Sequence, residues 1–273
     1  MHPILFTLRF GTHAIPVHAY GLLLAIALVV AVVRTCAVAE RRSKDGSAFR
    51  GDDVFDAGIW LIVCGLIGAR LLFVAFDWSS YKEHPLNALR FWEGGISFHG
   101  ALFGGFLALV VFCRRRKLSI LRIADLFAPS VILAYAIGRI GCFFNGCCYG
   151  MPTTMPWGVS FFDDGAWTPP SHPTQLYAAA LSLVFFGFLV LLERRKRFDG
   201  QVFFWYVLAA AVERFVMEIW RAGVTSTVYL GGITDVQILC LSMGILAVIG
   251  LQVMGRRSRA GVPGSGPVRV SQP

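Results

Sequence analysis

Ionisable side chains interrupt the long apolar stretches of this 273-residue chain, among them His99, Arg139, Arg214 and Glu218. If these stretches cross a membrane, each charge costs about 3 kcal/mol on insertion scales unless it is paired or lines a polar cavity. Arg214 and Glu218 are four positions apart and therefore share one face of a helix. Arginine matches phosphate geometry with forked donors, and histidine can transfer protons near neutral pH. The set predicts a site for an anionic headgroup.

Small residues surround two of these side chains. Arg139 lies within the tetrapeptide 138–141 (GRIG), and His99 is followed by Gly100. Glycines allow a ligand or another helix to approach closely. Two alternatives remain open. Arg214 and Glu218 could form an internal ion pair that only neutralises itself, and His99 could be a structural histidine at a membrane interface.

The composition indicates which elements position these residues. The chain is 56% hydrophobic and 15% charged, with a mean hydropathy of +0.65, so too few charged residues remain to cover a soluble globule. A membrane helix needs roughly 20 mostly apolar residues. Seven runs are suitable: Ile15–Ala39, Val54–Phe76, Ile96–Cys113, Ile123–Phe143, Thr174–Leu192, Val202–Trp220 and Ile233–Met254. The sequence therefore predicts an all-α, polytopic integral membrane protein.

The net charge of +9 predicts the orientation of the spans. Of the 25 Lys and Arg residues, 17 lie in the loops after spans one, three and five and in the tail, and four lie on the opposite side. The positive-inside rule then places the N-terminus outside and the C-terminus in the cytoplasm. Separated basic clusters at helix ends also argue against nucleic-acid binding. We expect one membrane domain over residues 1–255 and a disordered tail over 256–273.

The cysteines do not have the spacing of a metal motif. Cys142, Cys147 and Cys148 are close in sequence, but the last two are adjacent and no CxxC pair is present. No histidine lies nearby at zinc spacing. The sequence therefore predicts no metal site.

Five segments resemble, in the same order, the motifs of the prolipoprotein diacylglyceryl transferase family. Segment 138–146 (GRIGCFFNG) is similar to the family signature, and segment 90–100 (RFWEGGISFHG) contains its FHG motif. Segment 172–177 (HPTQLY) matches HPxQLY, and segment 214–221 (RFVMEIWR) matches RFxxExxR. The pair Tyr20-Gly21 in the first span completes the series. Seven spans with an external N-terminus also agree with the family.

The resemblance implies a reaction and its partners. Members move the diacylglyceryl group of phosphatidylglycerol to the thiol of a lipobox cysteine in a preprolipoprotein, the first step of bacterial lipoprotein maturation. The expected location is the bacterial inner membrane, with the active site toward the outer leaflet. The expected partners are phosphatidylglycerol, the lipobox segment of the signal peptide and membrane lipids. The chemistry requires no metal or soluble cofactor.

The resemblance also implies roles for single residues. Arg139 would hold the headgroup, Arg214 would stabilise the phosphate and Glu218 would orient it. His99 is the candidate for activating the thiol. Further contacts with the substrate are implied for four residues: Tyr20, Gly141, Asn145 and Arg221.

Several positions depart from the common family pattern. Cys147 stands where many members have glutamate, and Cys142 stands where many have asparagine. Ala178 and Asp235 are further departures. An alternative is therefore a diverged, low-activity paralogue that binds lipid or lipoprotein without turnover. A transporter is a third hypothesis, but the sequence shows no internal repeat that would favour it.

Overall fold

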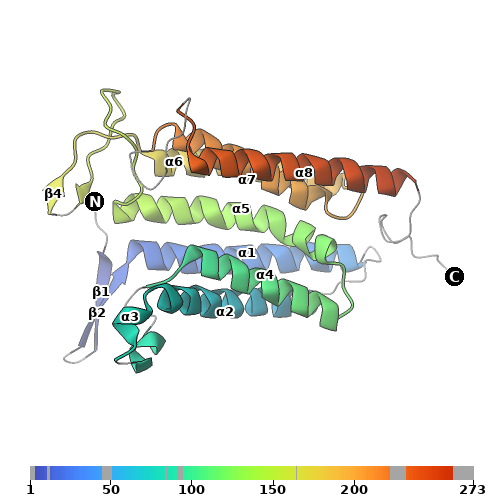
Figure 1. Ribbon diagram of the computed structural model, residues 1–273, viewed down its shortest axis with the longest axis horizontal. Helices are drawn as coiled ribbons and strands as arrows, with labels where there is room; N and C mark the ends of the chain where they lie inside the picture. The colour runs from blue at the N-terminus through green and yellow to red at the C-terminus, as the bar shows by residue number, and fades with distance from the viewer. Residues whose placement is uncertain are drawn as a thin grey trace. The chain divides into compact units, whose positions relative to one another are not determined.

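The computed structural model describes residues 4–10, 13–44, 51–83, 85–90, 95–163, 165–221 and 232–260. Within these residues the long elements are helical (Figure 1). The long helices are α1 (Ala19–Lys44), α2 (Gly51–Phe76), α4 (Phe98–Arg115), α5 (Ile120–Asn145), α6 (Thr174–Arg194), α7 (Gln201–Glu218) and α8 (Asp235–Arg259). Short elements are α3 (Trp78–Tyr81), a 3-10 turn at Pro85–Leu89, and two small hairpins.

Helix length and side-chain exposure both agree with an integral membrane protein. Among the described residues, five helices are long and apolar enough to cross a membrane: α1, α2, α5, α6 and α8. Large apolar side chains on them face outward, for example Leu71, Val184 and Ile245, each at least 60% exposed. Such a surface is expected against lipid and is uncommon on a soluble domain. The predicted all-α membrane class is therefore confirmed. Helices α4 and α7, with 18 residues each, occupy the third and sixth expected spans.

The first expected span begins too early. Residues 15–18 belong to strand β2 (His13–His18), which pairs antiparallel with β1 (Ile4–Phe10), and α1 begins at Ala19. Pro16 provides a physical reason, since proline lacks an amide hydrogen and is poorly tolerated inside a helix. A second small hairpin joins β3 (Phe162–Asp163) to β4 (Ala166–Trp167). Neither hairpin was expected from the apolar pattern.

The last helix continues past the expected domain boundary at residue 255. Helix α8 runs to Arg259, and basic residues in its last turn favour the negative end of the helix dipole. Its first turn is fixed by a capping box, in which the Thr234 hydroxyl accepts from Gln237 N and the Gln237 side chain accepts from Thr234 N. The rest of the expected tail, residues 261–273, lies outside the described residues.

The chain divides into two compact units. One contains residues 35–123, and the other contains residues 1–34 and 124–273. In the first, α2 and α4 pack side by side through glycines (Figure 1). A Cβ added at Gly68, Gly100 or Gly104 would overlap backbone atoms of the facing helix. This small-residue contact lets the two backbones approach closely without polar side chains.

The second unit has its core where α5, α6 and α7 meet. Ala128 and Ile132 of α5 pack with Leu189 of α6 and Val202 and Ala209 of α7. Figure 1 shows α6, α7 and α8 side by side, and α7 packs against both neighbours. Half of the most apolar window of α5 is buried, compared with 11–28% in the other candidate spans. Helix α5 is therefore the most enclosed of these helices.

Ionic contacts tie this unit together at the end where α6 finishes. Arg34 Nη2 lies 2.8 Å from Glu193 Oε2, which accounts for one charged residue within the first span. The buried Asp125 carboxylate accepts from the backbone N–H groups of Gly200 and Phe203, both at 2.7 Å, at the start of α7. Lys196 Nζ lies 2.9 Å from the same carboxylate. A carboxylate at a helix N-terminus satisfies orphan donors and the helix dipole.

Candidate active site

Arg139 lies in α5 above an aromatic ring that is itself hydrogen-bonded to a carboxylate. Its guanidinium carbon is 5.8 Å from the centre of the Tyr135 ring, one helical turn earlier. The Tyr135 hydroxyl donates to both carboxylate oxygens of Glu213 on α7, at 3.3 Å. Arg139 Nε is buried and has no hydrogen-bond partner among the described residues. A buried donor without a partner costs free energy, so this arrangement favours an anionic ligand.

Arg214 and Glu218 form the ion pair that their spacing predicts. Arg214 Nη1 lies 2.7 Å from Glu218 Oε2 on the same face of α7. The Glu218 side chain is 5% exposed, whereas the Arg214 side chain is 31% exposed. Glu218 is therefore the buried partner of the pair, and part of the Arg214 side chain remains accessible to a further anion. The geometry is therefore compatible with the alternative of a self-neutralising ion pair. Even within this pair, Arg214 remains able to bind an anion.

Gly141, two residues after Arg139 in α5, provides room for Tyr20. A Cβ at Gly141 would be in van der Waals contact with Tyr20 Cδ2 and Leu23 Cβ, both at 3.4 Å. Gly141 is thus the point where α1 approaches α5. Tyr20 is 40% exposed at the first turn of α1. Its ring therefore lies beside the GRIG segment.

The long segment between α5 and α6 is folded onto this helix end. Phe161 is completely buried and stacks on Tyr149, with ring centres 4.9 Å apart. Trp157 Nε1 donates to the Tyr177 hydroxyl at 2.7 Å, and His172 Nδ1 lies 3.2 Å from the same hydroxyl. The segment is a small packed layer and contains more structure than a belt of interfacial aromatics.

Arg221 is joined to this layer through the backbone. It forms an isolated β-bridge with Gly150, and Met151 N donates to Trp220 O at 2.8 Å. A Cβ at Gly150 would overlap the Trp220 carbonyl, so glycine is required for this approach. Asn145, the last residue of α5, is exposed and lies near the Cys147 thiol. The predicted contact residues Asn145 and Arg221 therefore border the same loop.

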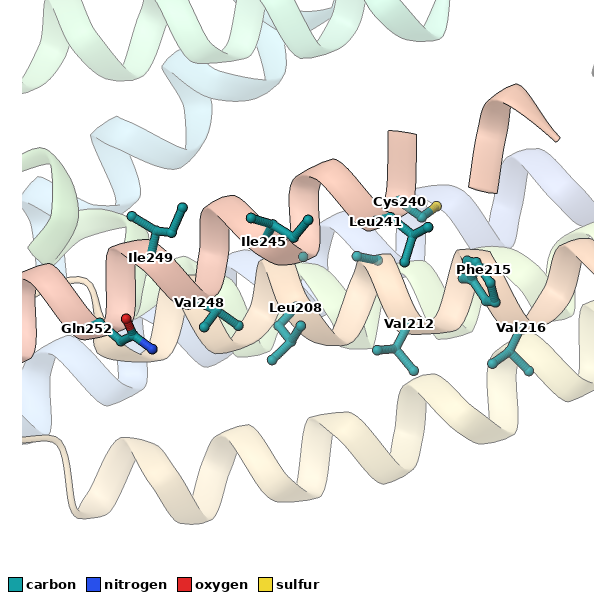
Figure 2. A pocket seen from close by; sticks show the side chains of 12 residues that line it. Leu208, Val212, Phe215, Val216, Cys240, Leu241, Ile245, Val248, Ile249 and Gln252 are labelled. Atoms are coloured by element: carbon teal, nitrogen blue, oxygen red, sulfur yellow. The ribbon is translucent and has the colours of Figure 1, made fainter. Parts of the chain in front are cut away.

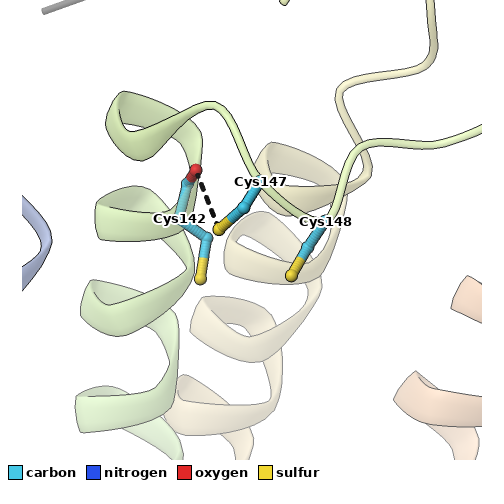
Figure 3. Close-up of side chains that lie close together, drawn as sticks. All are labelled: Cys142, Cys147 and Cys148. Carbon is cyan, nitrogen blue, oxygen red and sulfur yellow. Dashed lines mark hydrogen bonds between the residues drawn. The ribbon is translucent and has the colours of Figure 1, made fainter. Parts of the chain in front are cut away.

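The three neighbouring cysteines gather at the end of α5. Although Cys147 and Cys148 are adjacent in sequence, their sulfurs and that of Cys142 all lie within 4.8 Å of one another (Figure 3). The Cys147 thiol also contacts the Cys142 carbonyl at 3.7 Å. The pKa of the Cys148 thiol is lowered, first because the other two thiols hydrogen-bond to its sulfur and then because Arg139 and Arg221 are near. Sequence spacing alone gave no sign of this cluster.

His99 belongs to the other unit and is described by itself. It lies in the first turn of α4, after the N-cap Ser97, whose hydroxyl accepts from Gly100 N. Its side chain is exposed. Arg70 of α2 donates to the carbonyls of three residues that precede α4, namely Asn87, Ala88 and Gly95, at 2.7–3.0 Å. Arg70 thus holds the chain that leads into the helix of His99.

Comparison with known proteins agrees with these motifs. Residues 3–253 match the family model described as prolipoprotein diacylglyceryl transferase. The chain belongs to this family. Relatives named phosphatidylglycerol–prolipoprotein diacylglyceryl transferase include proteins from Clostridium tetani (34% identical, covering 81% of this chain and 86% of the relative), Parasynechococcus marenigrum (34%; 94% and 95%) and Cereibacter sphaeroides (36%; 88% and 88%).

Two features of this family member were not found from the sequence. Gln175, in the HPTQLY segment, is completely buried and donates through Nε2 to Cys147 O at 2.7 Å. Tyr135 joins Arg139 to Glu213 across two helices. Both contacts join segments that are distant in sequence. The sequence offered one sign of them, the polar Gln175 beside an apolar run, because a buried amide requires a hydrogen-bond partner.

An apolar groove runs along the same unit. It lies between α7 and α8, has a volume of about 510 Å³ and is lined almost wholly by aliphatic side chains (Figure 2). Val212, Phe215 and Val216 line it from α7, and Ile245 and Val248 line it from α8. Phe215 directly follows Arg214, so the groove starts next to the ion pair.

Proposed function

We propose that this chain transfers the diacylglyceryl group of phosphatidylglycerol to the lipobox cysteine thiol of preprolipoproteins. The observation that carries the proposal is the buried, unpartnered Nε of Arg139, within a segment that matches the family signature. A guanidinium so placed favours a phosphate diester. The family match over residues 3–253 and the transferase names of the relatives support the same reaction.

The reaction is a displacement at carbon. The thiol loses its proton, its sulfur forms a bond to the glycerol carbon of the diacylglyceryl group, and the bond from that carbon to the phosphate oxygen breaks. The electron pair leaves on glycerol phosphate, so the site must stabilise charge on the phosphate. Arg139 holds the headgroup, the exposed part of Arg214 stabilises the phosphate, and Glu218 orients Arg214. His99 is the candidate for activating the thiol.

The remaining proposed contacts lie along the end of α5 and the loop that follows it. Tyr20 and Gly141 form the close approach of α1 to α5, and Asn145 and Arg221 border the loop beyond it. The groove between α7 and α8 suits an acyl chain, because it is apolar and opens beside Arg214. A lipid bound in this way would have its phosphate at the arginines and a tail along α7.

We further propose seven membrane spans, with α4 and α7 as the third and sixth. The distribution of Lys and Arg supports an external N-terminus and a cytoplasmic C-terminus. This orientation directs the end of α5, with Arg139 beyond its midpoint, toward the outer leaflet of the bacterial inner membrane. The lipobox segment of a signal peptide would reach the site from that side. Residues 1–255 would act as one transferase domain.

The test is a mass measurement on a purified system. The protein in liposomes that contain phosphatidylglycerol is incubated with a lipobox peptide, and the peptide mass is followed. We expect an increase equal to one diacylglyceryl group, joined through a thioether, and release of glycerol phosphate. Liposomes of phosphatidylcholine alone are the control. An unchanged peptide mass with phosphatidylglycerol present would contradict the proposal.

The alternative of a silent, lipid-binding paralogue is not favoured. The relatives that match over 86–95% of their length are named as transferases. The same assay separates the two, since a silent paralogue would retain the peptide without changing its mass.

A further inference from the structure

The thiol cluster has dimensions close to those of a tetrahedral metal site. The sulfurs of Cys142, Cys147 and Cys148 lie within 4.8 Å of one another. Zinc–sulfur bonds of about 2.3 Å place the sulfurs of a tetrahedral site about 3.8 Å apart, so a contraction of about 1 Å is sufficient. Figure 3 shows the three side chains around one space beside the end of α5. The group offers three ligands from the described residues, the number found where a site keeps an open position.

Contacts from α6 hold the loop that carries two of these ligands. The buried Gln175 amide donates to Cys147 O at 2.7 Å, and the Thr174 hydroxyl donates to Cys148 O at 2.9 Å. Cys148 has a φ of 63°, a left-handed conformation that costs a non-glycine residue free energy. The two hydrogen bonds retain this conformation. Backbone support of this kind fixes ligands before a metal arrives.

The charges around the cluster also suit a bound cation with three thiolates. Such a centre has a net charge of about −1, since each thiolate contributes one negative charge to Zn²⁺. Arg139 and Arg221 both lie within electrostatic reach of Cys148. Their positive charges offset the excess negative charge. Cys148 is exposed, so a ligand can reach the cluster from solvent.

We propose that Cys142, Cys147 and Cys148 bind Zn²⁺ and that the thiol of the lipobox cysteine occupies the fourth position. The inference deepens the proposed function and rests on it. On binding, the thiol releases its proton to solvent. Its sulfur then forms the carbon–sulfur bond while the carbon–oxygen bond to phosphate breaks. No oxidant or reductant is required. The cluster thereby supplies the thiol activation for which His99 is the family's candidate.

Metal content tests the first half of the proposal. The protein, purified without a polyhistidine tag from zinc-supplemented cells, should contain about one zinc per chain. Cys142→Ser, Cys147→Ser and Cys148→Ser should each lose most of it, whereas Cys36→Ala should retain it. Cys36 lies in α1, outside the cluster. Absence of zinc from the wild-type protein, or a disulfide between these cysteines, would overturn the proposal whether or not the protein is active.

Cobalt tests the second half. Co²⁺ exchanged into the wild-type protein should give sulfur-to-metal charge-transfer bands, and a lipobox peptide should intensify them. The same peptide with serine for cysteine should have no effect. Unchanged bands with the cysteine peptide would overturn ligation of the substrate. Chelation should remove transfer activity and zinc together, and added zinc should restore both. Zinc and peptide binding without any transfer would instead contradict the proposed function and leave the metal site standing.

Discussion

At the scale of single residues, Arg139 differs from Arg34 and Arg70, two other arginines within the apolar helices. Arg34 is paired with Glu193, and Arg70 is occupied by loop carbonyls. Arg139 instead contacts the Tyr135 ring and keeps a buried Nε without a partner among the described residues. The first two arginines stabilise the fold, whereas the third has binding capacity left for a ligand.

We predict that Arg139→Lys is nearly as inactive as Arg139→Ala. A lysine ammonium is a point charge and does not replace the forked donors of a guanidinium. Loss of one preorganised donor at a developing charge typically lowers kcat by about 10²–10³-fold. The liposome assay measures this, with Arg257→Ala at the exposed end of α8 as the control. Full activity of Arg139→Lys would place the headgroup elsewhere.

Gln175 provides a second prediction at this scale. Gln175→Leu removes the donor to the partly buried Cys147 carbonyl, and an unsatisfied buried acceptor costs about 1–3 kcal/mol. We expect a lower thermal midpoint and also a higher KM for the lipobox peptide, since the cysteine loop is no longer fixed. Ser182→Ala is the matched control. Its hydroxyl is buried in the same helix without a partner among the described residues. An unchanged KM would assign Gln175 a purely structural role.

The sequence identified part of this site correctly. The pair of Arg214 and Glu218 follows from helical spacing alone, and the structure confirms it at 2.7 Å. The contact of Tyr135 with Glu213 joins residues 78 positions apart, and that of Gln175 with Cys147 joins residues 28 apart. Local spacing contains no information on such pairs. Likewise, adjacent cysteines give the wrong spacing for a familiar metal motif, although the turn at Cys148 brings the sulfurs together.

At the scale of elements, glycines determine how closely α2 and α4 pack. We predict that Gly104→Ala destabilises the protein by about 1–3 kcal/mol, because overpacking forces backbones apart. A Cβ there would overlap the Cys64 carbonyl. Gly187→Ala in α6 is the matched control, since no atom lies within 4 Å of its added Cβ. Unfolding in mixed detergent micelles measures both, and the control should be neutral or more stable. Equal stabilities would contradict the packing role.

The apolar pattern predicted helices well and their starts less well. Each of the seven runs contains a long helix in the described residues. The hairpin of β1 and β2 escaped notice, because Ile15 and Val17 continue the apolar run into α1 and only Pro16 marks the break. Hydropathy reports burial in lipid or protein and does not distinguish a short strand from the first turn of a helix.

At the scale of the whole molecule, the charge asymmetry predicts an orientation and thereby the side of the proposed reaction. The segment between α5 and α6, residues 146–173, contains no Lys or Arg, whereas residues 194–197 contain four. The Arg139 site lies in the half of α5 next to the uncharged segment, and the network of Asp125 and Lys196 lies at the other end. Which face is outside therefore decides from which side a lipobox segment reaches Arg139.

We predict that the uncharged segment is external and the basic end is cytoplasmic. Alkaline phosphatase, which is active only outside, should be active when fused after Thr168 and inactive after Arg195. Green fluorescent protein fused to the full chain should fluoresce, since the basic last turn of α8 is retained inside. Phosphatase activity after Arg195 would reverse the orientation. It would also remove the proposed route, because a signal peptide displays its cysteine near the outer leaflet, and Arg139 would then face the opposite one.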